Sequence, residues 1–278
     1  MTQSPATLAR PAARRSVRWA ISRRLQPLLA PLLRPLRDWQ APRIHRWMMH
    51  EASRPVQLTT KSALIIAPHH DDETFGCGGL IALKRDAGVP VKIVVVTDGR
   101  QSHGSVPGTD INQLAQTRKR EALRAINLLG VASQDVHFLD LPDQGLQTLD
   151  ETRRKEAVAT LGDLLKSFRP QELYVNHRTD RHPDHEATYR LVESAMAQSA
   201  TPIDVYQYPI WLLWKGPCRL SLRPKEYSNA LRLDVRPAQE RKDRAIELYA
   251  SQLPVLPRGF VGQFQQGYEI FFPAGPPA

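Results

Sequence analysis

Short apolar runs alternate with amphipathic stretches along most of the chain, beginning at Ser62. Runs of four to seven residues rich in Val, Ile and Leu predict strands at 63–67, 91–97, 136–139, 173–176 and 203–208. Continuous runs of this kind are typical of strands buried on both faces. Apolar residues spaced three and four apart predict helices at 79–87, 111–129, 152–168 and 187–197, and a further strand and helix follow at 230–235 and 238–251. The alternation predicts an α/β fold with a Rossmann-like, mostly parallel sheet and helices on both faces.

The pattern shows no internal repeat and no second core. Hydrophobic residues make up 41% and charged residues 24% of the 278 positions, which are ordinary values for a globular protein that buries a core. We therefore expect residues 61–278 to form one domain, preceded by a separate segment at 1–60.

Charge is distributed unevenly between these two parts. Residues 1–60 hold 11 Arg, no Lys and two acidic residues, whereas the remaining 218 residues hold 27 basic and 26 acidic side chains. The net charge of +10 therefore belongs almost entirely to the first 60 residues. A nucleic-acid-binding domain needs a cationic face of its own, so we expect no nucleic-acid partner.

The basic segment has several possible roles. Its apolar clusters are broken by prolines at 27, 31, 35 and 42, and no apolar run approaches the ~20 residues that cross a bilayer. An export signal, an organellar transit peptide, a solvated tail and an interfacial helix all match parts of the composition. The last of these predicts peripheral membrane contact through residues 1–55. The two cysteines, Cys77 and Cys218, lie 141 positions apart and indicate no disulfide framework, which favours a reducing, cytoplasmic location.

Two polar clusters follow predicted strands, at the edge of an α/β sheet where ligands bind. The first is Pro68-His69-His70-Asp71-Asp72-Glu73, and the second runs from His177 to Glu186; together they hold five of the nine histidines. Within each cluster, His and Asp or His and His recur at i, i+3, which brings the two side chains to one side of a helical turn. The clusters therefore predict a metal site, although a single histidine in such a loop more often has a structural role.

Zinc accepts nitrogen and oxygen ligands, and a catalytic zinc site has three protein ligands and an open position. His69, Asp72 and His185 supply such a set, and Asp71 would then be available as a general base. An acidic residue after a strand can also cap the next helix, but three consecutive acids after two histidines exceed what a cap requires.

These clusters resemble motifs of a known family. Ala67-Pro68-His69-His70-Asp71-Asp72-Glu73 is similar to the (A)HPDDE motif, and His182-Pro183-Asp184-His185 to the HPDH motif, of the PIG-L/LmbE-like deacetylases. The resemblance extends from about Ser62 to Gln252 and includes Thr97-Asp98-Gly99, Arg118-Lys119-Arg120-Glu121 and Leu141-Pro142-Asp143-Gln144-Gly145. It implies a Zn²⁺-dependent hydrolase that removes an acetyl group from an N-acetylglucosamine-type sugar in a glycoconjugate or glycolipid.

The resemblance also implies a role for each residue that matches a motif. It makes His69, Asp72 and His185 zinc ligands and Asp71 the general base. His182 would stabilise the oxyanion and protonate the leaving amine, with Asp184 orienting it, while Arg118 and Asp143 would contact the sugar. His70 departs from the family, which has Pro there, so it could loosen the loop or compete as a ligand.

Two other functions stay open on the sequence. A thiol-conjugate amidase of the same family would cleave a larger acyl group, and only the size of the pocket separates it from a deacetylase. A metal-free sugar- or nucleotide-binding module would use the same fold without needing a general base. The aromatic residues Tyr206, Tyr208, Trp211 and Trp214 are equally compatible with a platform for a sugar ring and with core packing.

Overall fold

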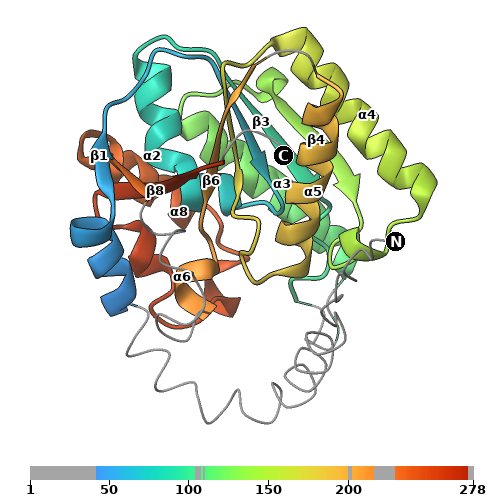
Figure 1. Ribbon diagram of the computed structural model, residues 1–278. Helices are drawn as coiled ribbons and strands as arrows, with labels where there is room; N and C mark the ends of the chain where they lie inside the picture. The colour runs from blue at the N-terminus through green and yellow to red at the C-terminus, as the bar shows by residue number, and fades with distance from the viewer. Residues whose placement is uncertain (1–41, 104–107, 109, 200–201, 216–228, 275–278) are drawn as a thin grey trace, which may run out of the picture.

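A single eight-stranded sheet forms the centre of the computed structural model, with strand order β1-β7-β8-β6-β5-β2-β3-β4 (Figure 1). The structure describes residues 42–103, 108, 110–199, 202–215 and 229–274. The predicted basic segment up to residue 41, Cys218 and residues 275–278 lie outside the described residues.

The elements follow the predicted alternation. The strands are β1 (Arg54–Val56), β2 (Ala63–Ala67), β3 (Val91–Thr97), β4 (Val136–Leu141), β5 (Glu172–Asn176), β6 (Asp204–Tyr208), β7 (Leu231–Asp234) and β8 (Tyr268–Pro273). The α-helices are α2 (Asp72–Asp86), α3 (Ile111–Leu128), α4 (Glu151–Phe168), α5 (Pro183–Ala197), α6 (Leu212–Lys215) and α8 (Gln239–Glu247). Short π- or 3₁₀-helical turns are η1 (Met48–Ala52), η2 (Ser133–Asp135), η3 (Leu146–Thr148), η4 (Arg236–Ala238), η5 (Leu253–Val255) and η6 (Val261–Phe264). Among the described residues, no helix combines the length and the apolar character that crossing a bilayer requires.

The sheet is mostly parallel, as predicted. Strands β6, β5, β2, β3 and β4 run parallel to one another, whereas β8 lies antiparallel between β6 and β7. Their carboxyl ends therefore share one edge of the sheet, where the loops after β2, β4 and β5 meet. Strand β8 was not predicted, although its Tyr-Glu-Ile-Phe-Phe-Pro sequence is largely apolar and aromatic.

Helices cover both faces of the sheet, which confirms the predicted fold class. One core contains side chains of α2, α3 and α8 packed against alternate residues of β2 and β3, such as Ile65 and Ile93. The other contains those of α4 and α5 packed against the intervening residues, such as Leu64 and Val94. Every residue of β2 is buried, because the strand faces a helical layer on each side.

Glycines bring helix α2 close to the sheet. A Cβ atom on Gly76 would lie 2.3 Å from the Tyr208 ring, and one on Gly79 would lie 2.4 Å from Cβ of Val235. The run Gly76-Cys77-Gly78-Gly79 therefore serves close helix packing, and Cys77 is fully buried. Helix α2 begins seven residues before the predicted start, because its first turn is built from buried polar residues.

The described part of the basic segment is folded with the domain. Residues 42–47 are helical and continue into η1, whose Met48 and Met49 are buried against Leu213, Ile270 and other side chains. Strand β1 then pairs with β7 at the edge of the sheet. The folded unit thus includes residues 42–60, which the sequence had assigned to the preceding segment.

Candidate active site

The loop after β2 carries the first polar cluster into the shared edge of the sheet. Asp71 precedes helix α2 with φ at 135°, a region that non-glycine residues rarely adopt. The Glu73 carboxylate accepts a hydrogen bond from the Asp71 amide at 3.1 Å. Glu73 in turn accepts hydrogen bonds from the hydroxyls of Thr74 and Tyr249. This buried network holds Asp71 in its unusual conformation.

Three atoms that could bind a metal ion converge where the two polar clusters meet. His69 Nδ1 lies 3.1 Å from His185 Nε2 and 3.2 Å from Asp72 Oδ2, and the last two atoms are 3.2 Å apart. Tetrahedral zinc with bonds of about 2.0–2.2 Å places its ligand atoms about 3.3 Å from one another. Two other groupings, His69-His182-His185 and His69-Asp143-Asp184, have ligand atoms within 4.8 Å of one another. The set with Asp72, whose three edges are 3.1–3.2 Å, consists of the residues that the sequence predicted as metal ligands.

The second nitrogen of each ring faces a carboxylate. His69 Nε2 lies 3.3 Å from Asp143 and 3.4 Å from Asp184, and His185 Nδ1 lies 2.7 Å from Asp180. A proton held on that side leaves the lone pair of the opposite nitrogen directed at the common point, which is the arrangement that metal-bound histidines require. The residues present therefore fit a divalent metal ion.

Burial and charge shift the proton affinities of the cluster. Burial lowers the pKa of His69, but hydrogen bonds with Asp143, Asp184 and Asp72 outweigh it and hold that pKa well above its usual range. Burial, opposed by Arg118 and reinforced by Asp72, raises the pKa of Asp71 to about 8. A divalent cation beside Asp71 would favour the ionised carboxylate.

His182 and Asp184 lie at the start of helix α5. The His182 ring accepts a hydrogen bond from the Asp184 amide at Nδ1, 3.3 Å away, so the neutral ring carries its proton on Nε2. The His182 ring lies 4.8 Å from those of both His69 and His185, measured between centroids. The Asp184 carboxylate accepts hydrogen bonds from the amides of Gln144 and Leu146, at 2.6 and 3.2 Å, besides facing His69.

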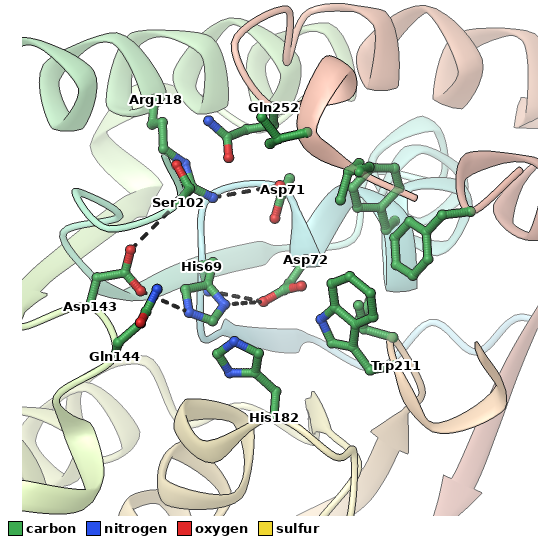
Figure 2. A pocket seen from close by; sticks show the side chains of 15 residues that line it. His69, Asp71, Asp72, Ser102, Arg118, Asp143, Gln144, His182, Trp211 and Gln252 are labelled. Atoms are coloured by element: carbon green, nitrogen blue, oxygen red, sulfur yellow. Dashed lines mark hydrogen bonds and ion pairs between the residues drawn. The ribbon is translucent and has the colours of Figure 1, made fainter. Parts of the chain in front are cut away.

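A cavity of about 200 Å³ opens over the cluster. Arg118 lies in its wall with a guanidinium nitrogen 3.6 Å from the Asp71 carboxylate and another 3.9 Å from Asp143. The predicted sugar-contacting residues therefore lie beside the predicted base. Figure 2 shows Asp143 and Gln144 on one side of His69 and Trp211 on the other, so the cavity has a polar wall and an aromatic wall.

His70 is not one of the cavity-lining residues, although its backbone carbonyl accepts a hydrogen bond from Arg118. The His70 ring is fully buried and stacks on Phe138 with centroids 5.5 Å apart. Neither of its ring nitrogens has a hydrogen-bond partner among the described residues. Burial and the charge of Arg118 hold the pKa of His70 well below its usual range. The structure thus gives His70 a packing position in place of the ligand position that it could have taken.

Several cavity residues carried no signal in the sequence. Of the aromatic residues considered for a sugar platform, Trp211 lines the cavity, whereas Tyr208 and Trp214 are buried in the core. The remaining lining residues come from distant segments, and no motif marks them: Phe75, Ser102, Ile210, Gln252, Val255, Leu256 and Phe260. Val255, Leu256 and Phe260 lie beyond the stretch that resembles the family.

Comparison with known proteins adds to this geometry. Residues 64–196 match the family model described as PIG-L: GlcNAc-PI de-N-acetylase. Just under half of the chain therefore resembles the PIG-L family. The matched residues run from β2 through α5 and include all three converging side chains, so the PIG-L motifs and the convergent geometry coincide. A relative from Gordonia bronchialis, 1D-myo-inositol 2-acetamido-2-deoxy-alpha-D-glucopyranoside deacetylase, is 28% identical over 245 residues, which cover 70% of this chain and 86% of that protein.

Solved structures share the fold of this chain. N,N'-diacetylchitobiose deacetylase from Pyrococcus horikoshii is similar with a TM-score of 0.56 and 21% identity, over 76% of this chain and 83% of that one. GalB, the 4-carboxy-2-hydroxymuconate hydratase from Pseudomonas putida KT2440, is similar with a TM-score of 0.60 and 18% identity, over 78% of this chain and 98% of that one. The fold therefore carries more than one reaction. Matches to other curated relatives span as little as 54% of the relative's own length.

Proposed function

We propose that this protein is a metal-dependent deacetylase that removes the acetyl group from an N-acetylated sugar of the N-acetylglucosamine type. The observation that carries the proposal is the convergence of His69 Nδ1, Asp72 Oδ2 and His185 Nε2, with edges of 3.1–3.2 Å, beside the buried Asp71 carboxylate. The Gordonia relative supports the substrate class, because its name specifies a 2-acetamido sugar deacetylase.

Zinc bound by these three side chains would polarise the amide carbonyl and lower the pKa of a water molecule to about 7. Asp71 takes a proton from the attacking water. His182 stabilises the developing oxyanion by a hydrogen bond from Nε2. When the ring is protonated on both nitrogens, it donates the Nε2 proton to the leaving amine and returns to the neutral form. The proton that Asp71 took from the water then restores the charge of His182, so the water supplies a hydroxyl to the acetate and a proton to the amine. Proton transfers of this kind contribute about 100-fold to 10,000-fold each in rate.

The cavity walls suit a sugar. Arg118 and Asp143 offer charged hydrogen-bonding groups on one side, and Trp211 offers an aromatic face on the other. Trp211 stacks on Phe260 with ring centroids 4.4 Å apart, which fixes its plane at the cavity. Polar groups on one wall and an aromatic surface on the other match the hydroxyls and the apolar face of a pyranose ring.

Metal content and product release test the proposal together. We expect purified protein to bind about one zinc ion per chain, and to release acetate from at least one member of a panel of soluble and lipid-linked N-acetylhexosamines. The His185→Ala variant should remain folded and lose most of the metal. Undiminished zinc content in that variant would exclude the ligand assignment, and release of a larger acyl group from a thiol glycoside, with no acetate, would identify the amidase instead.

The Asp71→Asn variant separates the base from the ligands. It should keep its zinc and lose at least about 100-fold in kcat, the low end for a general base. Asp140→Asn is a matched control, because Asp140 also has a positive φ, at 50°, but pairs with Lys119 outside the cavity. Turnover by Asp71→Asn equal to that of Asp140→Asn would refute the assignment.

We also propose that the basic segment contacts an anionic membrane surface at the cytoplasmic face. Trp47 is 39% exposed and follows the exposed Arg46, a pairing that suits the headgroup boundary. Because Met48, Met49 and β1 belong to the folded unit, the test deletes residues 1–41 and not 1–55. The truncated protein, which keeps Arg46 and Trp47, should bind phosphatidylglycerol-containing vesicles more weakly at low salt than the full-length protein and keep its activity on a soluble substrate. Failure of the full-length protein to bind these vesicles at low salt would contradict the membrane role.

A further inference from the structure

Asp180 is a fully buried carboxylate in the loop between β5 and α5. It was part of the second polar cluster, but no motif gave it a role. It lies outside the cavity lining, five residues before His185, and its Oδ2 atom is 2.7 Å from His185 Nδ1. A buried carboxylate is costly unless its oxygens are hydrogen-bonded, so its remaining contacts indicate what it holds.

Those contacts lead to the aromatic wall. The Asp180 carboxylate accepts hydrogen bonds from three successive amides, those of Ile210, Trp211 and Leu212, at 2.8–3.2 Å. These amides lie just before and at the start of helix α6, whose free N–H groups attract a negative charge. The side chains of Ile210 and Trp211 line the cavity. One carboxylate therefore fixes both a converging histidine and the backbone that presents the aromatic wall.

The two sets of contacts share the same oxygens. Oδ2 faces His185 Nδ1 and accepts from the Trp211 amide at 3.2 Å, while Oδ1 accepts from all three amides. A rotation of the His185 ring would therefore move the oxygen to which Trp211 is bound. In the other direction, a displacement of residues 210–212 would remove the acceptor that keeps the His185 proton on Nδ1 and its Nε2 lone pair turned toward Asp72.

We propose that Asp180 is a positioning residue that couples occupancy of the metal site to the aromatic wall of the cavity. Metal binding at His185 Nε2 fixes the ring, the ring fixes the carboxylate, and the carboxylate fixes the backbone of Ile210 and Trp211. By linkage, anything that orders the wall strengthens metal binding by the same factor. The inference rests on the proposed function only in taking the convergent set as a metal site, and it needs no knowledge of the sugar.

The zinc affinity of the Asp180→Asn variant tests whether Asp180 supports the metal site through His185. The substitution keeps the shape and removes the charge, and we expect zinc, measured by competition with a chelator, to bind about 10-fold to 100-fold more weakly. Glu172→Gln is the matched control: Glu172 is also a buried, hydrogen-bonded carboxylate, but it lies at the opposite end of β5, against Lys84. Its zinc affinity should equal that of the unsubstituted protein.

Amide hydrogen exchange tests whether Asp180 connects the metal site to the aromatic wall, because the amides of residues 210–212 donate to Asp180 itself. In the unsubstituted protein and in Glu172→Gln, zinc should slow their exchange by about 5-fold or more, the range of ordinary coupling between sites. In Asp180→Asn, zinc should leave their exchange unchanged. The comparison with and without zinc in the unsubstituted protein needs no substitution, so it decides the question even if Asp180→Asn does not fold.

The outcomes separate this inference from the proposed function. If the unsubstituted protein binds zinc but exchange at 210–212 ignores the metal, or if Asp180→Asn binds zinc within about 3-fold of the control, the coupling is refuted and the metal site stands. If the unsubstituted protein binds no zinc at all, both the metal site and the coupling are refuted.

Discussion

The buried ion pair between Lys242 and Glu269 allows a quantitative prediction about stability. Lys242 on α8 places Nζ 2.7 Å from Glu269 on β8, and both side chains are 1% exposed. Glu269 also accepts hydrogen bonds from the amides of Gly79 and Leu80 in α2, at 2.7 and 2.9 Å. Glu269 on β8 is thus bound both to α8 and to α2, the helix that begins with Asp72.

Replacing Lys242 by Met fills the same space and leaves the Glu269 charge buried without a cation. Removing one partner of a buried pair costs about 3–5 kcal/mol. At roughly 2–4 °C per kcal/mol for a domain of this size, Tm should fall by roughly 6–20 °C. The free energy of unfolding is measured by urea denaturation followed by far-ultraviolet circular dichroism, with the thermal midpoint as a second readout.

Two controls test whether the unpaired Glu269 charge causes the loss of stability. Lys92→Met makes the same change in a partly exposed pair, in which Nζ lies 3.4 Å from Asp135, and should cost no more than about 1 kcal/mol. The double variant Lys242→Met, Glu269→Gln should lose less than the sum of its two single variants, because neither charge is then left alone. Equal losses for Lys242→Met and Lys92→Met would refute the reasoning.

Further predictions concern helix packing and the metal. Gly79→Ala should lower the free energy of unfolding, measured by urea denaturation, by about 1–3 kcal/mol, because its Cβ would lie 2.4 Å from that of Val235. Gly162→Ala, where a Cβ meets no atom within 4 Å, should raise the free energy of unfolding by about 0.5–1 kcal/mol. The opposite order would contradict the packing argument. Carboxylate neighbours raise the pKa values of His69 and His185 against the lowering effect of burial, so the metal-free protein carries protons that zinc must displace. Zinc affinity should therefore weaken as pH falls through neutrality, and calorimetry in buffers of different ionisation enthalpy should show proton release; a pH-independent affinity would contradict this.

The sequence predicted the parallel part of the sheet well, because strands buried on both faces leave continuous apolar runs. Strands β2 and β3 have the predicted bounds. The start of α2 was missed because Asp72, Glu73 and Thr74 are buried for the site, so the first turn lacks an amphipathic pattern. Strand β8 was missed because it follows a region of turns and pairs with strands far away in the sequence.

The candidate site, like the fold, was predicted from the sequence only in part. Motif residues at the ends of β2 and β5 converge as predicted, since the carboxyl ends of parallel strands share an edge. Trp211, Gln252 and Phe260 reach the cavity from segments whose approach depends on tertiary packing. The importance of Asp180 was hidden for the same reason: three of its four partners lie 30–32 positions away.

The backbone at Asp71 bears on how such a chain would evolve. A non-glycine residue at φ 135° stores strain of about 1–3 kcal/mol, and only glycine occupies that region without it. Selection for folding alone would therefore favour glycine at position 71, whereas selection for catalysis retains the carboxylate. A descendant lineage that lost its substrate should drift to glycine there early and become more stable as its activity disappears.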